Sequence, residues 1–124
     1  MRKTGKEPFF VFTPQGRKVI GNIEHVGGQK VLVKKIDRQK HFHKNFAAYG
    51  LQAEALPRLR EAGVQAVRLL VENGEILQAS LDDLERYGFL RQFGAFGEQV
   101  FLPERYWHQV RPPAGALVQL RLFA

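Results

Sequence analysis

The sequence contains no cysteine, a single methionine and no long apolar run near its start. Without cysteine the protein can form no disulfide framework, has no thiolate nucleophile and cannot bind a metal through sulfur. The first apolar stretch, residues 9–12, is too short to span a membrane, and the charged residues before it do not form a signal peptide. We therefore expect a cytoplasmic protein without a membrane partner.

Motifs that bind nucleotides or activate a serine are also missing. The chain has neither G-x-x-x-x-G-K-[ST] nor G-x-G-x-x-G, two glycine-rich phosphate-binding patterns. It also lacks a serine-nucleophile elbow and the aromatic run of RNA-recognition domains. The sequence resembles no family that we recognise, and we expect no cofactor. The functional signal that remains is the distribution of charge.

Lysine is absent after residue 44, although the chain has eight lysines. With three arginines, residues 1–44 carry eleven cationic side chains against three acids, a net charge of +8. Residues 45–124 carry eight arginines and nine acids, a net charge of −1. A positive field concentrated in one stretch of chain favours a polyanionic partner, and nucleic acid is a common one.

The size and composition are those of one globular domain. The chain has 124 residues, of which 44% are hydrophobic and 25% are charged. We expect a single domain over residues 1–124, in which residues 1–8 form a flexible basic arm.

The clearest element of the basic stretch is a β-hairpin. Residues 18–26 and 29–37 are rich in β-branched side chains, and Gly27-Gly28 between them suits a two-residue turn with positive φ. In this register Lys18 would lie opposite Asp37, as a cross-strand ion pair. The hairpin therefore presents lysines along a two-stranded ribbon.

The same register predicts the two faces of this ribbon. Val19 and Ile23 would share one face with Lys34, while Lys18 would lie on the other face with Lys35. Because both faces mix apolar and charged side chains, the pattern leaves open which one meets the core. One face is expected to be wet and cationic.

The residues that follow this hairpin have the spacing of helices. Phe42 and Tyr49 are spaced for one side of a helix that Gly50 could end. Residues 52–62 predict a second helix that turns two leucines inward and ends at a glycine. The two pieces could also form one kinked helix.

A second hairpin joins residues 64–72 to residues 75–80 through Asn73-Gly74, the strongest hairpin signal in the chain. Tight pairing would place four apolar side chains on one face as a core stripe: Val67, Leu69, Val71 and Ile76.

The order of elements predicts the fold class. Ser80 followed by Asp83 is typical of a helix start and predicts a short helix over residues 81–87. Strands are expected in the remainder, including residues 117–123 at the end. Together these elements predict an α+β fold, with a twisted, mostly antiparallel sheet built from two β-hairpins plus flanking strands and two or three short helices.

The function that the sequence favours is binding of DNA or RNA through the phosphate backbone, as an independent protein or an accessory subunit of a nucleic-acid-processing complex. Clustered cations matter more than exact spacing for this purpose. The candidate binding residues are Lys18, Lys30, Lys34, Lys35, Arg38, Lys40, Phe42 and Lys44, with Tyr49 as a second stacking side chain. A surface that only keeps the protein soluble is the competing interpretation.

Two other functions stay open. His41 and His43, with Lys40 beside them, could act in a small nuclease as general acid and base, because imidazole titrates near neutral pH. Bound metal is disfavoured there, since Lys40 and Lys44 would repel a divalent cation. Alternatively, the aromatic segment 89–107, which begins with Phe89 and ends with Trp107, could bind a protein partner.

Overall fold

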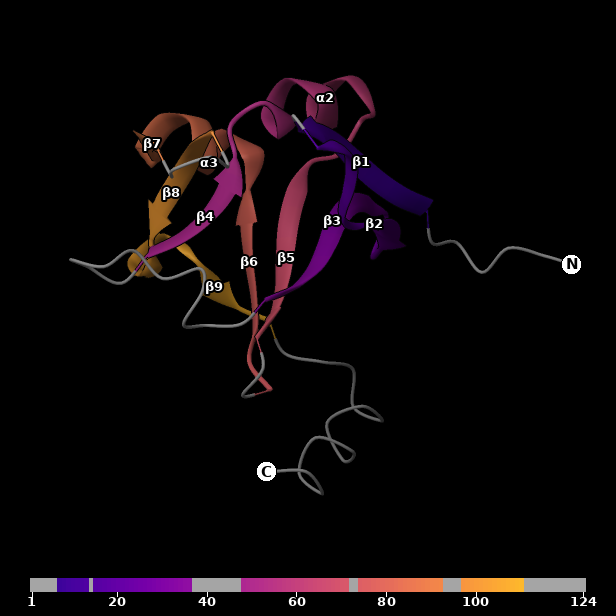
Figure 1. Cartoon of the computed structure of the whole chain (residues 1–124). Coiled ribbons are helices and arrows are strands. Elements are labelled where there is room, and N and C mark those ends of the chain that lie inside the picture. Colours follow the sequence, from indigo (N-terminus) through magenta and orange to yellow (C-terminus); the bar gives the residue numbers. More distant parts are fainter. Residues whose placement is uncertain (1–6, 14, 37–47, 72–73, 93–96, 111–124) are drawn as a thin grey trace, which may run out of the picture.

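A computed structural model describes residues 7–13, 15–36, 48–71, 74–92 and 97–110 (Figure 1). The described strands and helices follow in this order: β1 (Glu7–Thr13), β2 (Gly16–Val26), β3 (Gln29–Ile36), β4 (Ala48–Gln52), α2 (Ala55–Glu61), β5 (Ala66–Val71), β6 (Ile76–Ser80), α3 (Leu81–Tyr87), β7 (Phe89–Gln92), β8 (Glu98–Pro103), the 3₁₀ turn η2 (Glu104–Tyr106) and β9 (His108–Gln109).

The strands form two sheets. The larger sheet has the order β1-β2-β3-β5-β6-β9, and the smaller sheet has the order β4-β8-β7. Neighbouring strands are antiparallel in both sheets, except that β3 and β5 are parallel. The α+β fold class and the mostly antiparallel sheet are thus confirmed.

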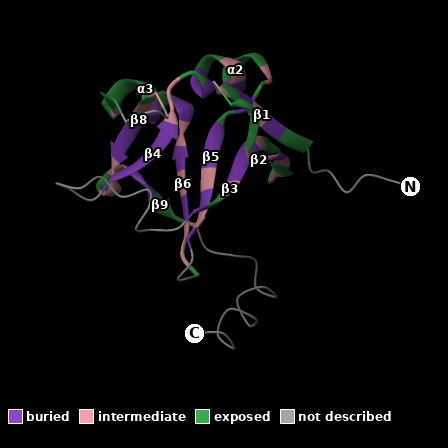
Figure 2. Cartoon of the chain, in the orientation of Figure 1, coloured by how far each residue is buried: buried purple, intermediate pink, exposed green. Residues whose placement is uncertain are grey.

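The main core lies where the two sheets and both helices meet. Val11 of β1, Leu32 of β3 and Val67 of β5 pack in one cluster with Tyr49 of β4 and Leu102 of β8. Helices α2 and α3 lie at the same end of the sheets (Figure 1, top), and exposed residues follow their outer sides (Figure 2). Burial of both sheets in one cluster explains why the strands of the amino-terminal ribbon have an inner and an outer side.

The first hairpin is confirmed with the expected turn. Gly27 and Gly28 both have positive φ, 57° and 81°, and Val26 pairs with Gln29. Two successive residues with positive φ match the right-handed twist of the strands, and glycine adopts this conformation without steric penalty. Asp37, the expected partner of Lys18, lies outside the described residues.

The face assignment of the first half of β2 is wrong, because the pairing with β1 contains a β-bulge. Phe9 pairs with Gly21 while Phe10 pairs with Val19, so that Ile20 is an extra residue on β2. An extra residue reverses the alternation of side chains beyond it. Val19 is accordingly 53% exposed, while Lys18 lies on the inner side, opposite the fully buried Val11.

The prediction of a helix that ends at Gly50 is wrong for the described residues, because Ala48–Gln52 form strand β4. This strand pairs along its whole length with β8, from Ala48 with Pro103 to Gln52 with Gln99. Tyr49 is fully buried, so it cannot stack on a nucleic-acid base. Pairing with a strand fifty residues away overrides the local helical spacing.

The second hairpin forms in a register one residue away from the expected one. The Val71 N–H donates to the Glu75 carbonyl at 2.9 Å, so the loop has three residues rather than two. Gly74 has φ 96°, as hairpin loops of this length require near their end. The core stripe therefore continues in Leu77 and Ala79, and Ile76 lies outside the core cluster.

The two described helices agree with the sequence in most respects. Helix α2 begins at Ala55, three residues later than expected, and turns Leu56 and Leu59 inward. Helix α3 starts as predicted, because the Ser80 hydroxyl accepts a hydrogen bond from the Asp83 N–H at 3.0 Å.

We predict that Gly21→Ala destabilises the protein by about 1–3 kcal/mol, because a Cβ at this position would lie 2.6 Å from the Val33 carbonyl oxygen. The obstacle is backbone of β3, which cannot move aside as a flexible side chain can. Urea unfolding measures the change, with Val19→Ala as a control on the same strand. Equal stability of Gly21→Ala and the wild type would mean that β2 and β3 can separate at this point.

Candidate nucleic-acid interface

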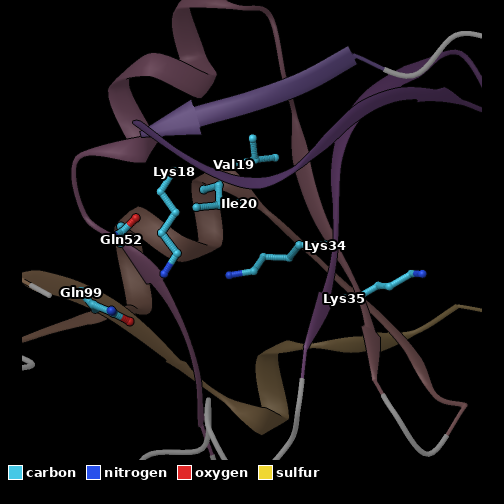
Figure 3. A pocket seen from close by; sticks show the side chains of 7 residues that line it. All are labelled: Lys18, Val19, Ile20, Lys34, Lys35, Gln52 and Gln99. Atoms are coloured by element: carbon cyan, nitrogen blue, oxygen red, sulfur yellow. The ribbon is translucent and has the colours of Figure 1, made fainter. Parts of the chain in front are cut away.

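A cavity of about 190 Å³ lies where the amino-terminal ribbon approaches the smaller sheet (Figure 3). Strands β2, β3, β4 and β8 contribute its walls. Its described lining residues are Lys18, Val19, Ile20, Lys34, Lys35, Gln52 and Gln99. We call it the lysine cavity, because three of these residues are lysines. No acidic residue is among the described residues that line it.

The bulge and a close strand crossing bring two lysines together in this cavity. Lys18 points inward because the bulge at Ile20 places it on the side of β2 that faces the core. Lys34 lies on β3 between the buried Leu32 and Ile36, and its Cβ would lie 3.1 Å from a Cβ at Gly21. The amino groups of Lys18 and Lys34 point toward one another across the cavity (Figure 3).

Lys34 has an unusual environment for a lysine. The residue is half-buried, and its amino group lies in the cavity, where neighbouring protein atoms take the place of part of its hydration. Burial, and secondarily the charge of Lys18, lower the pKa of Lys34 from 10.5 to about 8. Within the described part of the chain, Lys34 has no carboxylate partner to offset this burial. A partly buried cation with no counter-ion among the described residues is suited to receive an anion.

Two glutamine amides complete the cavity. Gln52 of β4 and Gln99 of β8 are directly paired across the smaller sheet, and both point into the space beside the lysines (Figure 3). The Gln52 Oε1 atom is buried and accepts no hydrogen bond. Arg91 of β7 lies opposite Gln99 and extends this row to the exposed edge strand. The row therefore leads from the cavity to a further cation.

The other predicted binding residues have different surroundings. Lys35 is exposed, and its amino group points away from Lys34 and Lys18 (Figure 3). The Lys30 ammonium donates a hydrogen bond to the Ala62 carbonyl at the end of α2, at 2.7 Å, so it contributes to the fold. The remaining members of the set, which are Arg38, Lys40, Phe42 and Lys44, lie outside the described residues, as do His41 and His43.

Sequence reasoning missed a second group on the outer side of β1 and β2. The Arg17 guanidinium lies 4.3 Å from the centre of the Phe10 ring, and Phe12 is 63% exposed. Arg58 reaches the same strand from α2, with its guanidinium 5.3 Å from the Phe12 ring and a hydrogen bond to the Phe10 carbonyl. The alternation of residues 9–12 was the available signal, since it separates the two outer phenylalanines from buried Phe9 and Val11.

The aromatic segment 89–107 is described in part, since residues 93–96 lie outside the described residues. Trp107 is buried, and its indole N–H donates to the Leu102 carbonyl at 3.0 Å. Phe101 is also buried, at 2% exposure. Among its described residues Leu90 is exposed, and the exposed Tyr87, just before the segment, stacks on Tyr106 with ring centres 4.5 Å apart. Packing, rather than recognition, accounts for the two buried aromatics.

Metal ligands are not grouped in the described ranges: no three histidines, aspartates or glutamates there could hold one ion. His25 on β2 and His108 on β9 are both exposed. In the same part of the chain, neither helix has the length or the apolar character needed to cross a bilayer.

The chain matches no protein-family model, and neither the curated proteins nor the solved structures contain one that is similar to it. Its own residues therefore carry the functional argument.

The lowered pKa of Lys34 predicts how stability depends on pH. The folded state loses this proton near pH 8 while the unfolded chain keeps it to about 10.5, so the unfolded state binds more protons between these values and stability rises with pH. We expect Lys34→Met to exceed the wild type by roughly 3 kcal/mol at most at pH 7. The difference should shrink from pH 8 toward pH 10.

Urea unfolding of both proteins at pH 7, 8, 9 and 10 measures this difference. Lys35→Met removes a neighbouring exposed lysine and controls for the loss of a lysine as such. If the difference in unfolding free energy between Lys34→Met and the wild type stays constant over this range, the pKa of Lys34 is not lowered by its surroundings.

Proposed function

We propose that the protein binds nucleic acid through phosphate groups, and that the lysine cavity is its principal phosphate contact. The observation that carries this proposal is the partly buried ammonium of Lys34 beside Lys18, without an acid among the described lining residues. Lysine attracts phosphate as a compact point charge, and the attraction strengthens where water is partly excluded. The accessory-subunit role and the cytoplasmic location stay predictions.

The surroundings of the cavity support the same function. Two further cations are exposed, Arg17 on the outer side of β2 and Arg91 on β7. Phe12 adds an exposed ring on the outer side of β1, where a base could stack. Phosphate contacts position a nucleic acid, whereas few side chains here could read base edges, so we expect modest sequence specificity.

A surface evolved only for solubility explains these features less well. A lysine that serves solubility lies in water, where its charge is hydrated at no expense to the fold. Lys34 instead lies between two buried residues of a central strand and next to a like charge. Retaining a destabilising cation inside the protein is understandable if a ligand supplies the missing negative charge.

We expect labelled oligonucleotides to bind with an affinity that falls steeply with salt, and Lys34→Gln to weaken binding about tenfold with a shallower salt dependence. Fluorescence anisotropy at salt concentrations from roughly 50 to 200 mM gives both the affinity and its salt dependence. Arg86→Gln is the matched control, because it removes one exposed positive charge on α3, outside the cavity.

If the wild type and Lys34→Gln bind with the same affinity, the cavity is not part of the interface. Absence of binding to any oligonucleotide at low salt would overturn the proposed function. A denaturing gel of the same samples detects cleavage and so tests the nuclease alternative.

A further inference from the structure

Resting on the proposed function, we further propose that the nucleic acid is single-stranded and that its bases stack on the outer side of the amino-terminal ribbon. We call this surface the outer platform. It consists of four side chains, which are Phe10 and Phe12 of β1 and Arg17 and Val19 of β2. The buried Phe9 and Val11 lie on the opposite side of the same strand.

Strand pairing brings these four side chains to one side of the ribbon. Phe10 lies opposite Val19, and Phe12 lies opposite Arg17. The Arg17 guanidinium reaches the neighbouring pair and lies 4.3 Å from the centre of the Phe10 ring. Phe12 and Val19 are both exposed, although they are large apolar residues. Exposed apolar surface beside a guanidinium suits a nucleobase, which has an apolar face and an anionic backbone next to it.

The spacing along β1 fits bases that are separated from one another. Phe10 and Phe12 are two residues apart, which corresponds to roughly 6.6 Å along a strand. Successive nucleotides of one duplex strand rise by about 3.4 Å. Base faces inside a duplex are covered by their neighbours, and only base edges are accessible in the grooves. A single strand, by contrast, can turn base faces toward both positions.

Two hydrogen bonds at the edge of β1 disfavour a protein strand as the occupant. Strand β1 is the first strand of the larger sheet, and an open edge strand can pair with another chain. Here the Phe12 N–H donates to the Glu54 carboxylate at 3.2 Å, and the Phe10 carbonyl accepts from the Arg58 guanidinium. Both bonds occupy backbone groups that an added strand would need, but they leave the Phe12 ring exposed.

The outer platform adjoins the lysine cavity. Val19 belongs to both, since it lines the cavity and also lies opposite Phe10 (Figure 3). Strand β2 pairs with β3 from Asn22 to Val26, and Val19 lies before this paired part. We therefore expect one strand to place phosphates at the cavity and neighbouring bases on the outer platform.

The test compares one labelled oligonucleotide as a single strand and annealed to its complement, by fluorescence anisotropy at low salt. We expect the single strand to bind at least tenfold more tightly than the duplex. Phe12→Leu keeps an apolar side chain but removes the ring, so it should weaken single-strand binding roughly tenfold and leave duplex binding unchanged. Phe12→Trp should retain the preference for the single strand, because it retains an aromatic ring.

Tyr87→Leu is the matched control, because it makes the same kind of change at an exposed ring of α3, outside the outer platform. It should leave the affinity for both forms unchanged. Thermal melts verify that each variant is folded.

The outcomes separate the outer platform from the proposed function. Equal affinity for the two forms, or single-strand binding that Phe12→Leu leaves unchanged, would overturn the outer platform and leave phosphate-mediated binding standing. Binding of neither form would overturn the proposed function, and the single-strand preference with it. Sedimentation velocity of the free protein examines a second copy as the occupant. A dimer that Phe12→Leu converts to a monomer would identify the outer platform as a protein interface and overturn its role in base stacking.

Discussion

The close approach of β2 to β3 at Gly21 is the constraint on which the amino-terminal half depends. No side chain fits there, since a Cβ would lie 2.6 Å from the Val33 carbonyl oxygen. One residue earlier, Ile20 is the extra residue of the β-bulge that sets the inner side of β2. Strand β2 can therefore bury Ile23 after the bulge and still turn Lys18 inward before it. Without these two features Lys18 and Lys34 would lie on opposite faces of a flat ribbon.

The position of Lys34 lowers the stability of the unliganded protein and favours the binding of an anion. Strand β3 lies inside the larger sheet between β2 and β5, where an apolar side chain at this position would stabilise the core. An ammonium in the same place raises the free energy of the unliganded protein, and an anionic ligand would lower it again. Such a conflict between local environment and residue type is typical of functional sites. It distinguishes Lys34 from Lys35, which is exposed, and from Lys30, which is bonded to the end of α2.

The outer side of β1 and β2 adds a different chemistry to the same ribbon. Arg17 lies over the half-buried Phe10, and Arg58 lies near the exposed Phe12, so each ring on this side has a cation beside it. Cation–π pairs of this kind hold the side chains in place at a water-exposed surface. The inner side of the ribbon thus offers the half-buried Lys34 beside the exposed Lys18, whereas the outer side offers aromatic rings with cations beside them. These are the two surfaces that the proposed function assigns to the phosphates and to the bases of a strand.

The sequence by itself determined the features that depend on neighbouring residues. These are the glycine turn at Gly27-Gly28, the cap of α3 at Ser80, the inward leucines of α2, the α+β class and the concentration of charge. Only the tertiary structure decided which lysines meet, because neither the β-bulge between β1 and β2 nor the pairing of β4 with β8 has a local sequence signal. The same holds for Tyr49, which has helical spacing in the sequence but lies in β4 and pairs with Leu102 of β8. Local chemistry selects turns and caps, but long-range packing selects which side chains share a cavity.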